Sequence, residues 1–153
     1  MKLLIFDTNK KVISIPESSI ARSGQPWFMP DFGVNWRWRK ALAVKVSRLG
    51  KGVSYKHANR YVDSMTVLWV AEADPCNALQ FMDGRVVCGQ WLPIHDELSE
   101  EIKDAIVEVS KYSTLKNGDI IAVMLSEEPI GIEQNTTISI DLNDENVVKF
   151  NIK

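Results

Sequence analysis

Cysteine and histidine are both scarce in this sequence of 153 residues, which holds two cysteines, Cys76 and Cys88, and two histidines, His57 and His95. Two cysteines cannot form the disulfide framework of a small secreted domain, and we expect free thiols in a reducing cytosol. Neither histidine has a metal-ligating partner nearby in the sequence. The sequence therefore excludes a disulfide-rich scaffold and offers no histidine-based metal centre.

Long hydrophobic runs are also missing. No window approaches the roughly 20 apolar residues that cross a bilayer, and the apolar run at residues 3–6 is too short for a signal peptide. The 18 basic and 20 acidic residues nearly balance, for a net charge of -2, so the chain has no overall attraction to nucleic acid or anionic lipid. We expect a cytoplasmic protein without a membrane partner, folded as a single domain over residues 1–153.

The common catalytic motifs do not occur either. The sequence has no Gly-x-Ser-x-Gly nucleophile motif, and Gly50-Lys51-Gly52 lacks the rest of a phosphate-binding loop. Asp63, Glu72 and Asp74 flank an apolar segment. We interpret these three acids as solvated side chains, with oxygen ligation of a divalent cation as the alternative.

Hydrophobic periodicity predicts a mainly β protein. Residues 36–46 alternate with period two, which is typical of a long strand, whereas residues 97–112 repeat apolar side chains at helical spacing. The Asp83-Gly84 pair between apolar residues predicts a hairpin. Further strands are expected at 2–5, 12–15, 65–71, 120–125, 137–142 and 147–152, and a short helix at 54–61. The fold class is therefore mainly β with one long and one short helix, an α+β arrangement.

The one unusual cluster of side chains is Trp36-Arg37-Trp38-Arg39-Lys40. Basic residues interleaved with aromatic residues can bind a single nucleic acid strand by charge and stacking. Period two, however, places the tryptophans and the arginines on opposite faces of a strand. We favour tryptophans that pack in the core or in an interface, and keep single-stranded nucleic-acid binding as a weaker alternative.

Three segments of the chain together resemble the fumarylacetoacetate hydrolase family. Residues 24–32 read Gly-Gln-Pro-Trp-Phe-Met-Pro-Asp-Phe, where the family typically has Gly-Lys-Pro-Phe-aromatic-Ile-Pro-Asp-Phe. Residues 41–51, Ala-Leu-Ala-Val-Lys-Val-Ser-Arg-Leu-Gly-Lys, are similar to its Glu-Leu-Val-Val-x-Ile-x-Arg-Leu-Gly-Lys strand and loop. Residues 113–119, Ser-Thr-Leu-Lys-Asn-Gly-Asp, match the Thr-Leu-Lys-x-Gly-Asp that ends its helix. The segments occur in the family's order, and the resemblance covers nearly the whole chain.

The resemblance implies the β fold of the family's C-terminal domain and an activity on carbon–carbon bonds of acylpyruvates and related 2-oxo acids. The family holds Mg²⁺ or Mn²⁺ through a Glu-x-Glu pair and an aspartate, and the cation stabilises a developing enolate. The corresponding positions here are Arg39, Ala41 and Trp69. The family's active-site lysine has no counterpart, because no lysine lies between Lys56 and Lys103. The resemblance thus implies a shortened member whose metal-ligand positions are replaced.

We therefore predict a non-catalytic homologue of this family, with no catalytic residue, no metal and no cofactor, that acts as a structural or binding protein. Relatives are often dimeric, so we expect a homodimer or a pairing with a related family member. Aromatic residues are enriched at interfaces, and we expect some of Trp27, Trp36 and Trp38 at the dimer interface.

The alternative is a remodelled, metal-independent enzyme acting on a 2-oxo acid or an acylpyruvate-type substrate. A small carboxylate ligand would then contact Arg39, because a guanidinium group suits that geometry. Glu72, Asp74 and His57 are the further candidate contacts, acids or bases. An inward-facing guanidinium needs an ion-pair partner, and we expect Asp74 to be the partner of Arg39.

Overall fold

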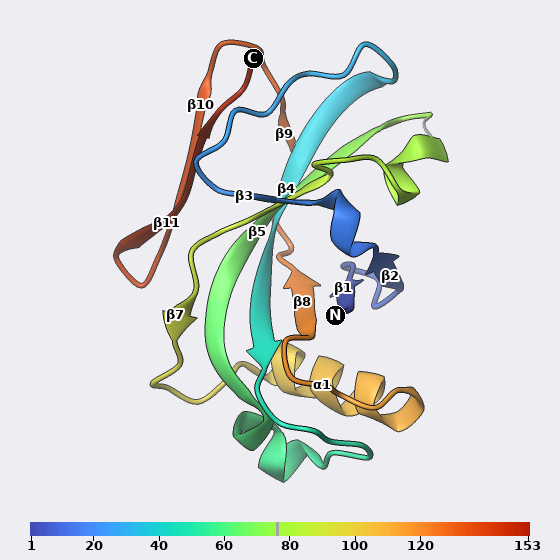
Figure 1. Ribbon diagram of the computed structural model, residues 1–153, viewed down its shortest axis with the longest axis vertical. Helices are drawn as coiled ribbons and strands as arrows, with labels where there is room; N and C mark the ends of the chain where they lie inside the picture. The colour runs from blue at the N-terminus through green and yellow to red at the C-terminus, as the bar shows by residue number, and fades with distance from the viewer. Residues whose placement is uncertain (76) are drawn as a thin grey trace.

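The computed structural model describes residues 1–75 and 77–153, in which a strongly curved nine-stranded sheet is accompanied by a two-stranded hairpin and one α-helix (Figure 1). The large sheet has the order β2-β1-β8-β4-β5-β6-β3, with β7 paired to β5 and β9 paired to β4. The strands are β1 (Leu3–Phe6), β2 (Val12–Ile15), β3 (Ile20–Arg22), β4 (Val34–Val46), β5 (Val62–Asp74), β6 (Val86–Cys88), β7 (Leu92–Pro93), β8 (Ile120–Met124), β9 (Ile130–Gly131), β10 (Thr137–Leu142) and β11 (Glu145–Asn151). The helices are α1 (Glu100–Tyr112) and the 3₁₀ segments η1 (Glu17–Ser19), η2 (Tyr55–Tyr61) and η3 (Asn77–Gln80).

Strands β4 and β5 are the long central pair of the sheet, with 13 residues each. The alternating segment at 36–46 and the apolar run at 65–71 lie within them, so both strand predictions are confirmed. The antiparallel register pairs Arg37 with Glu72, Arg39 with Val70, Lys40 with Trp69 and Ala41 with Leu68. Since successive side chains alternate between faces, the arginines share one face of the sheet and the tryptophans lie on the other.

The face that carries the tryptophans is covered by two elements. The β10–β11 hairpin stands along the upper part of the sheet, and α1 lies at its lower end (Figure 1). Trp27, Trp36, Trp38 and Trp69 pack with Phe150 of the hairpin in one apolar cluster, and all five are at most 8% exposed. Below them the apolar stripe of α1, including Ile102 and Ile106, packs against the lower half of β4 and against β8.

The opposite face is the concave interior of the curved sheet. The chain follows this side from β1 through β2 and η1 to β3. Strand β1 pairs with β2, and β3 pairs with β6. The interior is filled by small and aliphatic side chains that are almost completely buried: Leu3, Ile5, Ala41, Ala43, Leu68, Val70, Val86 and Ala122. The middle of this face is therefore solid core. Arg37, Arg39 and Glu72 lie toward one end of the β4–β5 pair, and Lys45, Ser64 and Thr66 lie toward the other.

A tight turn before β8 fixes the start of the chain. Asp119 is 3% exposed, and its carboxylate accepts hydrogen bonds from the backbone N–H groups of Lys2 at 3.1 Å and Lys116 at 2.9 Å. The Lys2 ammonium group approaches the same carboxylate at 2.6 Å. These contacts hold β1 in its parallel pairing with β8. The best-matching motif of the sequence, residues 113–119, thus ends in a structural turn.

Several predicted boundaries differ from the structure. The hairpin predicted at Asp83-Gly84 is wrong: these residues form a turn after η3, and β6 pairs with β5 and β3 instead. The long helix begins at Glu100, because the Ser99 hydroxyl accepts from the Ile102 N–H at 3.4 Å and caps it. The short helix is present as the 3₁₀ segment η2. In the described residues no helix is long and apolar enough to cross a membrane.

Candidate functional site

Polar side chains gather where β4 begins and β5 ends. The direct pairing of Arg37 with Glu72 places Arg39 diagonally across from the same carboxylate. Arg37 Nε lies 3.6 Å from Glu72 Oε2, and Arg39 Nε lies 3.5 Å from Glu72 Oε1. Glu72 is therefore shared by two guanidinium groups, and each of the three side chains is between 21% and 26% exposed.

Asp74 is part of the same network through Arg37. The two terminal nitrogens of Arg37 each lie 3.1 Å from one Asp74 oxygen, and Asn35 Nδ2 donates to Asp74 at 3.0 Å. The hydrogen bonds from Asn35 and then from Arg37 hold the pKa of this carboxyl below its usual range. Asn35 adopts a positive φ of 57° at the entry to β4, a conformation that asparagine tolerates better than most residues. The network thus ends in a fixed, ionised carboxylate.

The predicted partnership between Arg39 and Asp74 is wrong. Arg39 pairs with Glu72, and its Nη1 donates to the Glu127 carbonyl oxygen at 3.0 Å. Lys40 reaches the Glu127 carboxylate at 3.2 Å. The cause of the error lies in the strand register: Asp74 lies two residues beyond Glu72, where Arg37 reaches it and Arg39 does not. Arg37 and Glu127 are the members of the network that sequence reasoning did not place there.

The three positions that the resemblance relates to metal ligands do not meet at one point. Arg39 and Ala41 share the concave face, where Ala41 is completely buried opposite Leu68. Trp69 pairs with Lys40 and points to the other face, into the tryptophan cluster. The β5 residue that the register pairs with Arg39 is Val70, which is also completely buried. Trp69 therefore cannot share a site with Arg39, and Val70 is the β5 residue that faces Arg39.

The tryptophans predicted at a dimer interface are buried within the single chain. Trp27, Trp36 and Trp38 are 6%, 8% and 8% exposed, so they have almost no surface left for a partner. Trp69 lies between them, with edge-to-face contacts to Trp27 and Phe150 at centroid distances of 5.0 and 5.1 Å. Strand β4 consequently presents no aromatic ring on which a nucleic acid base could stack.

His57 does not join the network. It lies in η2, before β5 begins, and its Nδ1 is 3.4 Å from the Ser54 hydroxyl. Glu72 lies ten residues along β5 from Val62, a separation of about 33 Å in an extended strand. The candidate contacts Arg39, Glu72 and Asp74 are thus brought together, and His57 is placed at the other end of the molecule.

Two further titratable groups lie beneath the network. Arg85 is 7% exposed and donates to the carbonyl oxygens of Ala71 at 3.3 Å and Leu79 at 3.2 Å. Its burial lowers the pKa of the guanidinium group, and the charge of Glu72 opposes this. Burial raises the pKa of the Cys88 thiol to about 11, so that this thiol is protonated at neutral pH. Cys76 lies outside the described residues.

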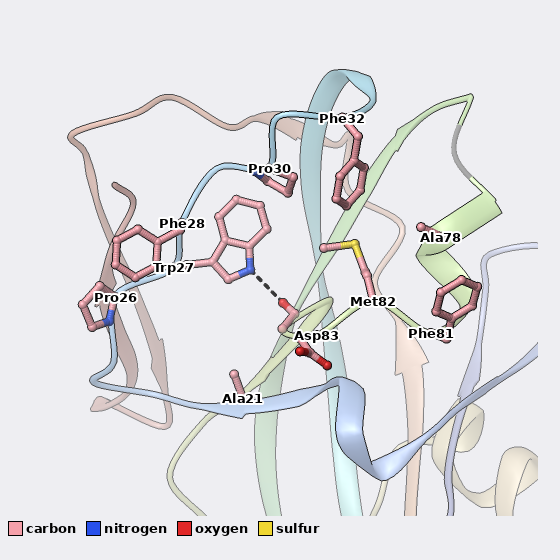
Figure 2. A pocket seen from close by; sticks show the side chains of 11 residues that line it. Ala21, Pro26, Trp27, Phe28, Pro30, Phe32, Ala78, Phe81, Met82 and Asp83 are labelled. Carbon is pink, nitrogen blue, oxygen red and sulfur yellow. Dashed lines mark hydrogen bonds between the residues drawn. The ribbon is translucent and has the colours of Figure 1, made fainter.

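A groove opens beside this region, between the loop before β4 and the segment after η3. It has a volume of about 660 Å³, and Figure 2 shows Phe28 and Phe81 on opposite sides of it. The Trp27 indole N–H donates to the Gly84 carbonyl oxygen at 2.7 Å and holds the two walls together. The groove is lined by Ala21, Pro26, Trp27, Phe28, Pro30, Phe32, Ala78, Phe81, Met82, Asp83 and Gly84.

Solved structures with the same arrangement of elements identify the fold. A maleylpyruvate hydrolase from Sphingobium sp. SYK-6, solved with manganese(II) and pyruvate, superposes with a TM-score of 0.85 at 15% identity, covering 99% of this chain and 69% of that one. A 5-carboxymethyl-2-hydroxymuconate delta-isomerase from Mycobacterium smegmatis gives 0.84 at 16% identity, with coverages of 99% and 78%. A Yersinia pestis CO92 protein described as a fumarylacetoacetate hydrolase family member gives 0.84 at 17%, with 99% and 92%.

The chain has the fumarylacetoacetate hydrolase fold. The resemblance found in the sequence is thereby confirmed at the level of the fold, over 99% of the chain. No protein-family model and no curated protein matches the sequence. The mainly β class with one long helix, α1, and one short helix, η2, is confirmed as well, and η1 and η3 are two further 3₁₀ segments.

The residues of this chain do not fit the divalent cation that the fold implies. The positions that face one another on β4 and β5 hold Arg39, Ala41 and Val70, none of which offers an oxygen ligand. In residues 1–75 and 77–153, no three His, Cys, Asp or Glu side chains are grouped as metal ligands. A divalent cation about 5 Å from a guanidinium group would be repelled by about 7 kcal/mol at an effective dielectric constant of about 20.

Proposed function

We propose that this protein is a non-catalytic homologue of the fumarylacetoacetate hydrolase family that acts as a structural or binding protein. The observation that carries the proposal is the ion-paired network of Arg37, Arg39 and Glu72 at the place where the resemblance puts metal ligands. The carboxylate of Glu72 is held on both oxygens by guanidinium groups. A general base or a cation ligand at this position would first have to give up both ion pairs.

The surroundings of the network support the same proposal. The middle of the concave face is filled by Ala41, Val70 and other apolar side chains, which leave no space for a substrate beneath the arginines. The thiol of Cys88 is held protonated by its burial and is a poor nucleophile in that state. We extend the proposal to a cytoplasmic protein that forms a homodimer or pairs with a related family member.

A second candidate function is a remodelled, metal-independent enzyme for a 2-oxo acid or an acylpyruvate-type substrate. The observation that favours it is the partial exposure of Arg37 and Arg39, at 24% and 26% of their side-chain surface. Two adjacent guanidinium groups can bind a carboxylate through charge-assisted hydrogen bonds. Such a substrate would compete with Glu72 for the arginines.

The replacement Arg39→Ala separates the two functions. If Arg39 is structural, the change should lower the free energy of unfolding by about 1 kcal/mol, because the ion pair with Glu72 is partly exposed and solvent weakens it. Oxaloacetate at about 10 mM should then leave the urea midpoint of wild type unchanged. The control is Arg60→Ala, on the exposed side of η2, which should change stability by at most about 0.5 kcal/mol.

The opposite pattern would favour the enzyme. It consists of a wild type that oxaloacetate stabilises, together with an Arg39→Ala variant that is stable on its own but no longer responds to oxaloacetate. The comparison uses equilibrium denaturation followed by tryptophan fluorescence, which the buried cluster around Trp69 makes sensitive to unfolding.

A further inference from the structure

Basic side chains gather at the lower end of the molecule, where the loop before η2, η2 itself and the end of α1 meet (Figure 1). Residues 47–61 and 109–118 form this end, and neither segment contains an aspartate or a glutamate. They carry six basic side chains, all of which are exposed: Arg48, Lys51, Lys56, Arg60, Lys111 and Lys116. We call these six residues the basic end.

Backbone hydrogen bonds hold the two segments side by side. Gly50 and Leu115 exchange hydrogen bonds at 3.1 and 2.7 Å. Two residues further on, the Gly52 N–H donates to the Ser110 carbonyl oxygen at 2.8 Å. A Cβ at Gly50 would lie 2.6 Å from the Tyr61 ring, so the loop packs closely on η2 and a side chain at this position would clash. The six charges therefore belong to one folded surface and not to a free loop.

Most of this charge is not neutralised within the chain. In residues 1–75 and 77–153, Lys111 is the one member of the basic end that has an acidic partner, the exposed Glu108 at 3.4 Å. The six positive charges are offset by a net charge of -8 in the rest of the chain, where 12 basic residues remain against 20 acidic ones. The overall charge of -2 thus hides a polarised molecule, and such a surface attracts an anionic partner.

Two exposed apolar side chains project from the same end. Leu49, next to Arg48 in the loop, is 69% exposed, and Tyr112, the last residue of α1, is 79% exposed. The pairing of Gly50 with Leu115 brings their two segments together. Surfaces that lie on anionic bilayers combine these residue types, because Lys and Arg meet the charged headgroups while Leu and Tyr enter the boundary below them.

We propose that the basic end binds the surface of an anionic phospholipid bilayer, with Leu49 and Tyr112 entering the headgroup region. Clusters of four to eight Lys and Arg are typical of such peripheral contacts, and each charge strengthens binding by about fivefold. The inference replaces the expectation of no membrane partner, which rested on the overall charge of the chain. It does not depend on the arginine network, since Arg37 and Arg39 lie at the other end of β4.

A single nucleic acid strand fits this surface less well. Strand binding combines phosphate contacts with several aromatic rings on which successive bases stack. Tyr55, at the start of η2, is 42% exposed, but the Lys103 ammonium group lies over its ring at 5.1 Å from the centroid. Tyr61 packs on Gly50, which leaves Tyr112 for stacking. An exposed leucine gains nothing from a phosphate backbone, so Leu49 favours the bilayer.

Co-sedimentation with large unilamellar vesicles tests the charge of the basic end. Wild type should bind phosphatidylcholine vesicles that contain about one third phosphatidylserine, should not bind vesicles of phosphatidylcholine alone, and should bind less as salt screens the charges. Arg48→Ala/Lys51→Ala should lower the partition coefficient by about 25-fold, or fivefold for each charge. The matched control, Lys149→Ala/Lys153→Ala, removes the same charge from β11 and the C-terminus, away from the basic end, and should change binding by less than about twofold.

Leu49→Ser tests the apolar contact in the same assay. It should lower the partition coefficient by about tenfold, because it removes an apolar side chain from the bilayer boundary without changing the charge. Phe81→Ser is the matched control, since Phe81 is 66% exposed and follows β5 at its opposite end. It should bind vesicles as wild type does. All four variants should fold, because each change is at an exposed position.

Wild type that stays in the supernatant with phosphatidylserine vesicles at about 0.1 M salt, where screening is moderate, would overturn the proposal. So would binding that Leu49→Ser leaves unchanged, or binding that the control variants weaken equally. A single-stranded oligothymidylate, followed by fluorescence anisotropy, probes the competing partner. If Arg48→Ala/Lys51→Ala abolished binding of this oligonucleotide and the vesicles were not bound, the surface would be one for nucleic acid and the proposal would be wrong.

Discussion

Trp69→Ala is expected to lower the free energy of unfolding by about 3–5 kcal/mol, the range measured for removal of large buried aromatic side chains. Trp69 is completely buried at the centre of the aromatic cluster. Its loss removes the contacts to Trp27 and Phe150 and leaves a cavity between the sheet and the hairpin. Urea denaturation followed by circular dichroism measures the change without relying on tryptophan fluorescence.

Trp69→Phe is the matched control for this experiment. Within the described part of the chain, the Trp69 indole N–H is buried without a hydrogen-bond acceptor. Phenylalanine keeps most of the aromatic packing and removes this unsatisfied donor, which offsets part of the lost volume. We expect a cost of about 1 kcal/mol. A Trp69→Ala variant as stable as Trp69→Phe would show that the hairpin does not depend on this ring.

Asp119→Ala is expected to cost about 3 kcal/mol, because it leaves two backbone N–H groups without their acceptor and removes the ion-pair partner of the Lys2 ammonium group. Asp119→Asn keeps an acceptor of the same shape and loses the charge, so it should cost about 1 kcal/mol. Thermal and urea unfolding of the two variants at neutral pH measure both values. If Asp119→Ala and Asp119→Asn lowered the free energy of unfolding equally, the shape and the hydrogen-bond acceptors of the side chain would contribute nothing to this turn.

The same carboxylate makes stability depend on pH. Burial opposes the ionisation of Asp119, but the hydrogen bonds from Lys2 and Lys116 outweigh it and hold the pKa of this carboxyl below its usual range in the folded state. A carboxyl whose pKa is lower in the folded state than in the unfolded state stabilises the fold. This stabilisation is complete at a pH above the unfolded-state pKa, and it is lost as the pH falls through the folded-state pKa. The stability difference between wild type and Asp119→Asn should therefore shrink as the pH falls below about 4. A difference that stays constant down to low pH would contradict this.

Strong periodicity and distinctive motifs made much of the fold predictable from sequence. The alternation at residues 36–46 and the helical stripe that includes Ile102 and Ile106 each specify one face, and both elements formed as expected. The Asp83-Gly84 hairpin failed because a local turn signal does not say which strand the next segment will pair with. Residues 86–88 pair with β5 and β3, contacts that depend on distant parts of the chain.

The candidate site was predicted less well than the fold. Sequence reasoning found Arg39, Glu72 and Asp74. Which acid pairs with which arginine depends on the register between β4 and β5, and a register shift of two residues exchanges Glu72 for Asp74 as the partner of Arg39. The same limit explains why Trp69 was placed beside Arg39, since a one-residue shift moves a side chain to the opposite face. The burial of Arg85 has no sequence signal, because it depends on the path of the segment after η3.

We propose that an ion-paired arginine network occupies the place where the resemblance puts metal ligands, and that it does not bind divalent cations. Calorimetric titration of the wild-type chain with Mn²⁺ and Mg²⁺ tests it most directly, with the maleylpyruvate hydrolase that was solved with manganese(II) as the positive control. We predict no heat above dilution for this chain and saturable binding for the control. Micromolar Mn²⁺ binding to this chain, with paramagnetic broadening of NMR signals from residues around Arg39 and Val70, would contradict the account.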